Sequence, residues 1–208
     1  AALMAVRLLR KMNFDPKGTV VLSYVIDEEN GSWMVVKYLV EQGLLNGDIG
    51  ICMEATDGRV LTAQWGILRM HFIYTAEPHH AGTPHPSIDA LEKAVAAINR
   101  LYALDAELNK HVNANGDRRC LSVTMIRSGN TPNVQPGYAE FVIDRRIGPD
   151  ESFDDAKAEI LAIFDSLKEA TPEFDYKWEL LNDRPSMTIP EDEPFIQLVC
   201  KSDEQIMG

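Results

Sequence analysis

Three consecutive carboxylates, Asp27, Glu28 and Glu29, directly follow an apolar run at residues 19–26. Carboxylates ligate metal ions and transfer protons, so adjacent ones are candidates for metal binding and for general base catalysis. In open α/β sheets, reacting groups collect beyond the carboxyl ends of the strands. Because this cluster stands where a buried strand is expected to end, it is the first candidate site of the chain.

The elements expected to position this cluster follow from the hydrophobic pattern. Residues 19–26 and 48–54 are predicted to form short buried strands, with a helix over Trp33–Leu45 between them. Helices that alternate with apolar strands indicate an α/β fold, mainly a parallel sheet with helices on both faces. Such a sheet brings the acidic cluster to the same edge as Glu54, which ends the second strand.

The acidic cluster also has a purely structural interpretation. Acidic residues just before the amino terminus of a helix interact favourably with the helix dipole, by ~0.3–1 kcal/mol each. Neighbouring residues on a strand face opposite sides, so Glu28 and Glu29 reach one site only where the strand has ended and the chain turns. Gly31 allows that turn. Spacing alone leaves both interpretations open and favours the structural one.

The composition restricts the partners and the cellular compartment. A net charge of -12 over 208 residues argues against a nucleic-acid backbone or an anionic membrane surface as partner. Cys52, Cys120 and Cys200 are widely spaced, so we expect free thiols in a reducing compartment and a cytoplasmic protein. The chain begins without methionine and inside a helical pattern, so we expect it to be the central part of a longer protein.

From about Gly66 the order of the expected elements changes. They are a strand, a helix, two strands, a helix and a strand, at residues 67–75, 87–104, 120–127, 138–147, 152–167 and 174–181. Each helix carries a single apolar stripe, so each is expected to cover the same antiparallel sheet. The sequence therefore predicts an α+β ferredoxin-like domain with βαββαβ order.

Several short motifs follow one another along the chain at compatible spacing. They are Asp27-Glu28-Glu29-Asn30-Gly31-Ser32, Met53-Glu54-Ala55-Thr56, Gly66-Ile67-Leu68, His80-Ala81-Gly82-Thr83-Pro84, Gly129 to Asn133 and Asp144-Arg145-Arg146. Together they resemble the zinc metallopeptidases and deacylases, the family of acetylornithine deacetylase, succinyl-diaminopimelate desuccinylase, aminoacylase and glutamate carboxypeptidase. The resemblance covers essentially the whole chain.

The resemblance implies a domain organisation and an activity. It implies part of a zinc-peptidase catalytic domain at residues 1–65, an inserted lid and dimerisation domain at 66–184, and a return to the catalytic domain at 185–208. The implied protein hydrolyses the amide bond of an N-acyl amino acid or a short peptide. It uses two zinc ions, with cobalt as an alternative metal, and forms a homodimer through the lid domain.

Under this resemblance, Glu28 corresponds to the general base, Glu29 to a ligand of one zinc ion and Glu54 to a ligand of the second. Two zinc ions ~3.5–4 Å apart hold a bridging water, lower its pKa toward ~7 and polarise the scissile carbonyl. A carboxylate that binds no metal takes the proton and returns it to the leaving amine. The adjacent glutamates thereby have different roles.

The remaining implied site residues lie in the lid domain. His80 corresponds to the family histidine that reaches across a dimer interface and donates to the oxyanion of the tetrahedral intermediate. Asn133 and Arg146 correspond to residues that hold the carboxylate of the substrate, which a guanidinium binds at two points. Without the resemblance, His80 would be a surface histidine as readily as a functional one, and Arg146 would more often be a solvated ion-pair member.

The match is incomplete. The family's His-x-Asp motif, its bridging aspartate and its second histidine ligand have no counterpart in this sequence, so we expect an inactive part of an enzyme that does not bind a zinc pair tightly. Two alternatives stay open. One is a noncatalytic dimerisation or ligand-binding module, in which the carboxylates only cap a helix. The other is a dipeptidase or carboxypeptidase of the same family.

Overall fold

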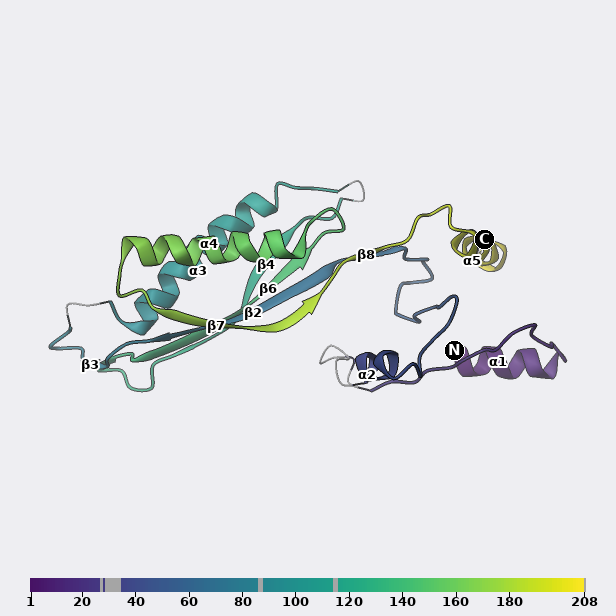
Figure 1. Cartoon of the computed structure of the whole chain (residues 1–208), viewed down its shortest axis with the longest axis horizontal. Helices are drawn as coiled ribbons and strands as arrows, with labels where there is room; N and C mark the ends of the chain where they lie inside the picture. The colour runs from purple at the N-terminus through teal and green to yellow at the C-terminus, as the bar shows by residue number, and fades with distance from the viewer. Residues whose placement is uncertain (27, 29–34, 86–87, 114–115, 208) are drawn as a thin grey trace. The chain divides into compact units, whose positions relative to one another are not determined.

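The computed structural model describes residues 1–26, 28, 35–85, 88–113 and 116–207. Its internal contacts divide the chain into two compact units (Figure 1). The first unit comprises residues 1–60 and 192–208, and the second comprises residues 61–191. The assignment of a lid and a catalytic domain to particular residues stays a prediction.

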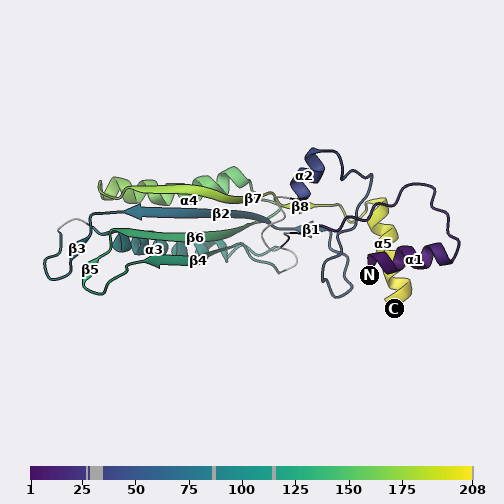
Figure 2. The same ribbon diagram turned by 90° about the horizontal axis from the view of Figure 1, so that it is seen from below.

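The second unit is built on a four-stranded antiparallel sheet with the order β4-β6-β2-β7. Its main elements, in chain order, are β2 (Gly66–Thr75), α3 (Ala90–Leu108), β4 (Cys120–Ser128), β6 (Tyr138–Ile147), α4 (Phe153–Ala170) and β7 (Tyr176–Arg184). Figure 1 shows both helices on the same side of the sheet, and Figure 2 shows the four strands side by side. The βαββαβ order expected from the sequence is therefore present.

Alternation along the two central strands explains this arrangement. On β2, Leu68, Met70, Phe72 and Tyr74 are buried, and they belong to the hydrophobic core that includes residues of both helices. Side chains of a strand alternate between the two faces, so the intervening residues point to the face that carries no helix. The ring of Phe72 stacks on Phe164 of α4 with centroids 4.1 Å apart. The core thus lies between the sheet and the helix pair.

Helix α3 packs against the sheet mainly through small residues. Ala90, Ala94 and Ala97 are fully buried, and Leu101 follows on the same face. These residues share one face of the helix, whereas Leu91, Val95 and Tyr102, which belong to the apolar stripe expected to cover the sheet, are exposed, so that part of the prediction was wrong.

The amino-terminal boundary of α3 differs from the sequence expectation of residue 87. The helix begins at Ala90, and the side chain of Asp89 caps it by accepting a hydrogen bond from the backbone N–H of Glu92 at 2.8 Å. Asp is among the residues most favoured at the amino-terminal cap of a helix, which accounts for the start at Ala90. Ser152, the first residue of the predicted span, caps α4, with its Oγ accepting from the N–H of Asp155 at 3.3 Å.

Two short ladders extend the second unit. Strand β1 (Ala63–Gln64) pairs with β8 (Met187–Thr188), and β3 (His79–His80) pairs with β5 (Val134–Gln135). The β3–β5 ladder lies beyond the end of the main sheet at which Thr75 pairs with Tyr138. It joins two loops that the sequence pattern treats as separate.

The first unit contains α1 (Ala2–Lys11), α2 (Val36–Glu41) and α5 (Pro194–Met207). The prediction of strands at residues 19–26 and 48–54 was wrong for the described residues, since none of these is assigned to a strand. A strand needs a neighbour for its backbone hydrogen bonds, and no described segment pairs with either run. Apolar side chains that were expected to be buried, such as Val21 and Ile51, are exposed.

Helix α2 is also shorter than the predicted span of Trp33–Leu45, part of which lies outside the described residues. Within the described part of the chain, no helix combines the length and the apolar character that crossing a membrane requires.

Two tyrosines of the sheet, Tyr74 on β2 and Tyr176 on β7, make the stability of the fold depend on pH. Burial raises the pKa of Tyr74, and burial followed by the charge of Asp165 raises the pKa of Tyr176 to about 12. A tyrosine in the unfolded chain titrates near ~10. The contribution of the raised pKa values to the free energy of unfolding is therefore fully present below that pH. It is lost as pH rises toward 12, because the unfolded state releases the proton first.

We therefore expect the free energy of unfolding, measured by urea denaturation, to fall between pH ~10 and ~12. The variant Tyr176→Phe should show a shallower fall, whereas Tyr102→Phe, at an exposed position on α3, should follow the parent chain. Identical slopes for all three proteins would contradict the assignment to Tyr176.

Candidate functional site

The acidic residues of the predicted site belong to the first unit. Glu28 is exposed and lies in a turn, and Glu54 is exposed in a segment without regular structure. Glu29, the predicted ligand of one zinc ion, lies outside the described residues. No hydrogen bond or ion pair joins Glu28 to Glu54 in the described part of the chain. The roles assigned to these three glutamates stay predictions.

A zinc site needs several ligands at close range, commonly His, Cys, Asp or Glu. Over the ranges that the structure describes, no group of three or more such residues is arranged to hold a metal ion. The described residues alone therefore do not fit the zinc pair that the sequence resemblance implies.

The structure brings two other predicted site residues together. His80 of β3 lies opposite Val134 of β5 in the ladder, and the next residue, Ala81, donates its backbone N–H to the carbonyl of Asn133 at 2.8 Å. His80 and Asn133 are both exposed. The β3–β5 ladder thus places an imidazole and a carboxamide at the same end of the second unit.

The imidazole of His80 is held by its own loop. The backbone N–H of Gly82 donates to Nδ1 of His80 at 3.0 Å, and the N–H of Thr83 donates to the carbonyl of His80 at 2.9 Å. Close by, the rings of His79 and His85 stack with centroids 4.5 Å apart. The side chain of Gln135 accepts the N–H of His85 at 3.1 Å. These contacts tie the loop 80–85 to β5.

Arg146 lies at the other end of β6. Its Nε is 2.9 Å from Oδ1 of Asp144, and Arg69 Nη2 is 2.6 Å from Oδ2 of the same residue. The Asp144 side chain is only 9% exposed, whereas that of Arg146 is 45% exposed. The ion-pair interpretation of Arg146 therefore describes its contacts in this chain.

Asn133 and Arg146 do not meet within one chain. The ladder that contains residue 134 lies beyond Tyr138, and Arg146 is eight residues further along β6. At ~3.4 Å per residue, roughly 27 Å separate the two ends of this stretch. A single substrate carboxylate could contact both residues only if they came from different subunits.

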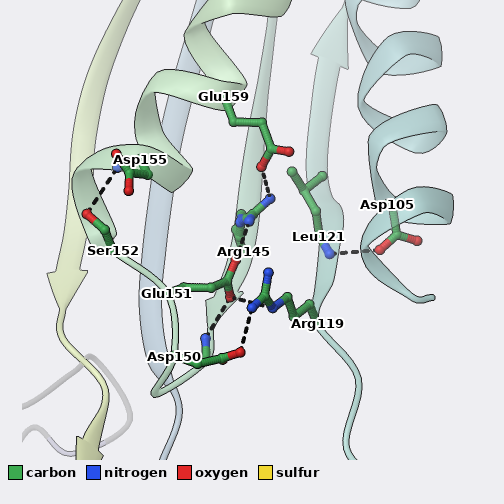
Figure 3. A network of polar contacts seen from close by, with 10 residues as sticks. Asp105, Arg119, Leu121, Arg145, Asp150, Glu151, Ser152, Asp155 and Glu159 are labelled. Carbon is green, nitrogen blue, oxygen red and sulfur yellow. Dashed lines mark hydrogen bonds and ion pairs between the residues drawn. The ribbon is translucent and has the colours of Figure 1, made fainter. Parts of the chain in front are cut away.

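A buried charge cluster near Arg146 was not predicted (Figure 3). Arg145, with a side chain only 2% exposed, donates from Nη2 to Oε1 of Glu151 at 2.7 Å, and its Nη1 is 2.9 Å from Oε2 of Glu159. The second oxygen of Glu151 accepts the N–H of Gly148 at 2.8 Å. The period of two along β6, which buries Phe141 and Ile143, is the signal that also predicts a buried side chain at position 145.

Arg119 extends this cluster toward the surface. Its Nη2 is 2.7 Å from Oδ2 of Asp150, and its guanidinium holds the pKa of Asp150 below the usual range. Arg119, Asp150 and His111 border an open hollow at the start of α4. Both arginines of its lining, Arg119 and Arg145, are paired with carboxylates of the same hollow.

A second cluster of polar side chains lies on the face of the sheet that carries no helix. Nδ1 and Nε2 of His71 lie 2.7 Å and 2.9 Å from carboxylate oxygens of Glu179 and Glu140. Tyr138 donates its hydroxyl to Glu140 at 2.6 Å, which lowers the pKa of Glu140. These contacts link β6, β2 and β7, as a structural role for His71 requires.

Comparison with known protein families identifies the second unit. Residues 62–172 match the model of the M20 peptidase dimerisation domain, which covers more than half of the chain and most of the βαββαβ unit.

Two curated relatives extend the similarity. An uncharacterized metallohydrolase of Methanocaldococcus jannaschii is 28% identical over 159 residues, which are 72% of this chain and 39% of that protein. Carboxypeptidase G2 of a Pseudomonas species is 26% identical over 193 residues, 91% of this chain and 44% of that protein. The chain thus spans less than half the length of these relatives.

A solved structure shows a similar fold over nearly the whole chain. The aminopeptidase PepT of Bacillus cereus matches with a TM-score of 0.68 and 15% identity, over 97% of this chain and 52% of that one.

Proposed function

Because the chain belongs to the M20 family of zinc metallopeptidases and deacylases, whose dimerisation domain it carries at residues 62–172, we propose that it is part of a metal-dependent hydrolase. The substrate is an N-acyl amino acid or a short peptide, and the bond cleaved is its amide bond. The family match over the βαββαβ unit carries this proposal. The names of the relatives, a metallohydrolase and a carboxypeptidase among them, support it.

In this proposal Glu28 is the general base, and Glu29 and Glu54 are metal ligands. Zinc, when bound, lowers the pKa of water and polarises a carbonyl. Glu28 takes the proton of the attacking water and returns it to the leaving amine, a role that suits its exposed position in a turn. The described residues supply no complete metal site, so the proposal requires further ligands besides these two glutamates.

The proposed homodimer uses the edge of the sheet formed by β4. An edge strand carries unpaired N–H and C=O groups, and β4 also exposes Met125 and Ile126. Helix α3, which packs on β4, exposes Leu91, Val95 and Tyr102 along one helical stripe. Ile126 pairs with the core residue Phe141 and so lies on the face of the sheet that carries α3, where strand and helix together offer apolar side chains to a second copy of the chain.

Metal analysis and an activity assay of the full-length protein test the proposal. We expect two zinc equivalents per subunit, and release of free amino acid from N-acyl amino acids or short peptides in the presence of zinc or cobalt. A protein without bound metal that cleaves none of these substrates would instead favour a noncatalytic dimerisation module.

A mixing experiment tests whether His80 acts across the dimer. The full-length variants Glu28→Gln and His80→Ala should each be inactive, because each subunit lacks either its own base or the imidazole that it gives to its partner. After subunit exchange, half of the dimers are mixed and one of their two sites is intact, so about a quarter of the parent activity should return. No recovery would place His80 and Glu28 in the same subunit.

A further inference from the structure

The contact between Gly82 and His80 has a chemical consequence for the histidine. A neutral imidazole carries its proton on one nitrogen and accepts hydrogen bonds at the other. Nδ1 of His80 receives the backbone N–H of Gly82 at 3.0 Å, so Nδ1 is the acceptor. The neutral ring then carries its proton on Nε2. We infer that Gly82 is a positioning residue, whose N–H fixes His80 in the Nε2–H tautomer and fixes the orientation of its ring.

A side chain at position 82 would crowd the ring of His80. A Cβ at this position would lie 3.1 Å from Nδ1 and 3.2 Å from Cε1 of His80, closer than side chains normally approach. Any larger residue would therefore push the ring away from the N–H that orients it. The same position thus combines a donor directed at Nδ1 with the absence of a side chain beside the ring.

The rest of the loop prevents the backbone from moving away. Ala81, between the two residues, donates to the carbonyl of Asn133 at 2.8 Å, and Thr83 donates to the carbonyl of His80 at 2.9 Å. His80 itself is paired with Val134 in the β3–β5 ladder. With its backbone fixed on both sides of Gly82, the loop presents Nε2 as the one ring atom of His80 that remains available to donate.

This tautomer matches the chemistry of the proposed reaction, on which the inference rests. An oxyanion needs an N–H donor at a fixed position, and a donor that is already oriented requires no rearrangement during the reaction. A ring with its proton on Nδ1 would direct a lone pair from Nε2 at the oxyanion. Gly82 therefore selects the donor form of the ring without contacting the substrate.

Nitrogen NMR of the histidine side chains in the full-length protein tests the inference directly. The His80 signals are assigned by their loss in His80→Ala. In the parent protein we expect the directly bonded proton on Nε2 and the shift of a hydrogen-bond acceptor at Nδ1. In Gly82→Pro, which removes the N–H, and in Gly82→Ala, which adds the Cβ, we expect both tautomers to be populated.

The same variants should lower kcat by about 10- to 100-fold with little change in KM, since the donor is misplaced while the substrate still binds. Gly18→Ala is the matched control, because a Cβ there meets no atom within 4 Å. A proton on Nδ1 in the parent protein, or an unchanged tautomer in Gly82→Pro, would overturn the inference about Gly82. Full activity of His80→Ala would instead overturn the proposed role of His80, whatever the NMR result.

Discussion

The variant Glu28→Gln of the full-length protein should lose amide hydrolysis, with kcat reduced by ~10²–10⁴ and KM nearly unchanged. Glutamine has almost the same shape as glutamate, but it cannot take a proton from water. The substitution therefore removes the proposed base while it leaves the size of the side chain intact. Steady-state kinetics on an N-acyl amino acid or a short peptide, with saturating zinc, measure the effect.

Glu41→Gln is the matched control for this variant. Glu41 is also an exposed glutamate of the first unit, at the end of α2, with Lys37 at 4.0 Å. An exposed pair of this kind contributes little to stability. We expect the kcat of Glu41→Gln to equal that of the parent protein. Unchanged turnover in Glu28→Gln would remove Glu28 as the base.

Arg145→Met should reduce the free energy of unfolding by about 3–5 kcal/mol, the usual cost of removing one partner from a buried ion pair. Methionine fills much of the space of arginine, so the loss comes mainly from Glu151, whose side chain is only 8% exposed and would lose its 2.7 Å contact with Arg145 while it retains the longer contact, at 3.4 Å, with Arg119. Urea denaturation of the chain, followed by circular dichroism, measures the change.

Two further variants separate this effect from a general loss of packing. Lys168→Met removes an exposed ion pair with Asp175 and should cost less than ~1 kcal/mol. The double variant Arg145→Met/Glu151→Gln should recover part of the loss, because a neutral amide replaces the buried carboxylate that Arg145 compensates. A single variant Arg145→Met as stable as Lys168→Met would contradict the assignment of Arg145 to a buried pair.

The sequence predicted those elements whose side chains alternate around a core within the chain. Leu68, Met70 and Phe72 of β2 repeat with a period of two, so the type of this element follows from pattern alone. The helical period also predicts α3, but its buried face carries alanines in place of the larger apolar residues of the expected stripe. The apolar run at residues 19–26 has the same composition as a buried strand. Strand formation, however, also depends on a hydrogen-bonded neighbour, which the composition of one segment does not reveal.

The candidate site, like the fold, could be predicted only in part from the sequence. The sequence motifs singled out His80 and Asn133, and the structure adds the β3–β5 ladder that joins them. A ladder of two residues on each side has no periodic signal that could predict it. The contacts of Arg146 with Asp144 and of Arg145 with Glu151 also depend on neighbours that only folding brings close. Glu29 stays a prediction, because it lies outside the described residues.

The pairing of β1 with β8 has a consequence for the entropy of chain closure. Gln64 and Met187 are partners in that ladder, so their Cα atoms lie only ~5 Å apart although most of the second unit separates them in sequence. Once this ladder has formed, residues 60 and 192 are connected as if by a short turn. The entropic cost of joining the two segments of the first unit then no longer grows with the length of the insertion.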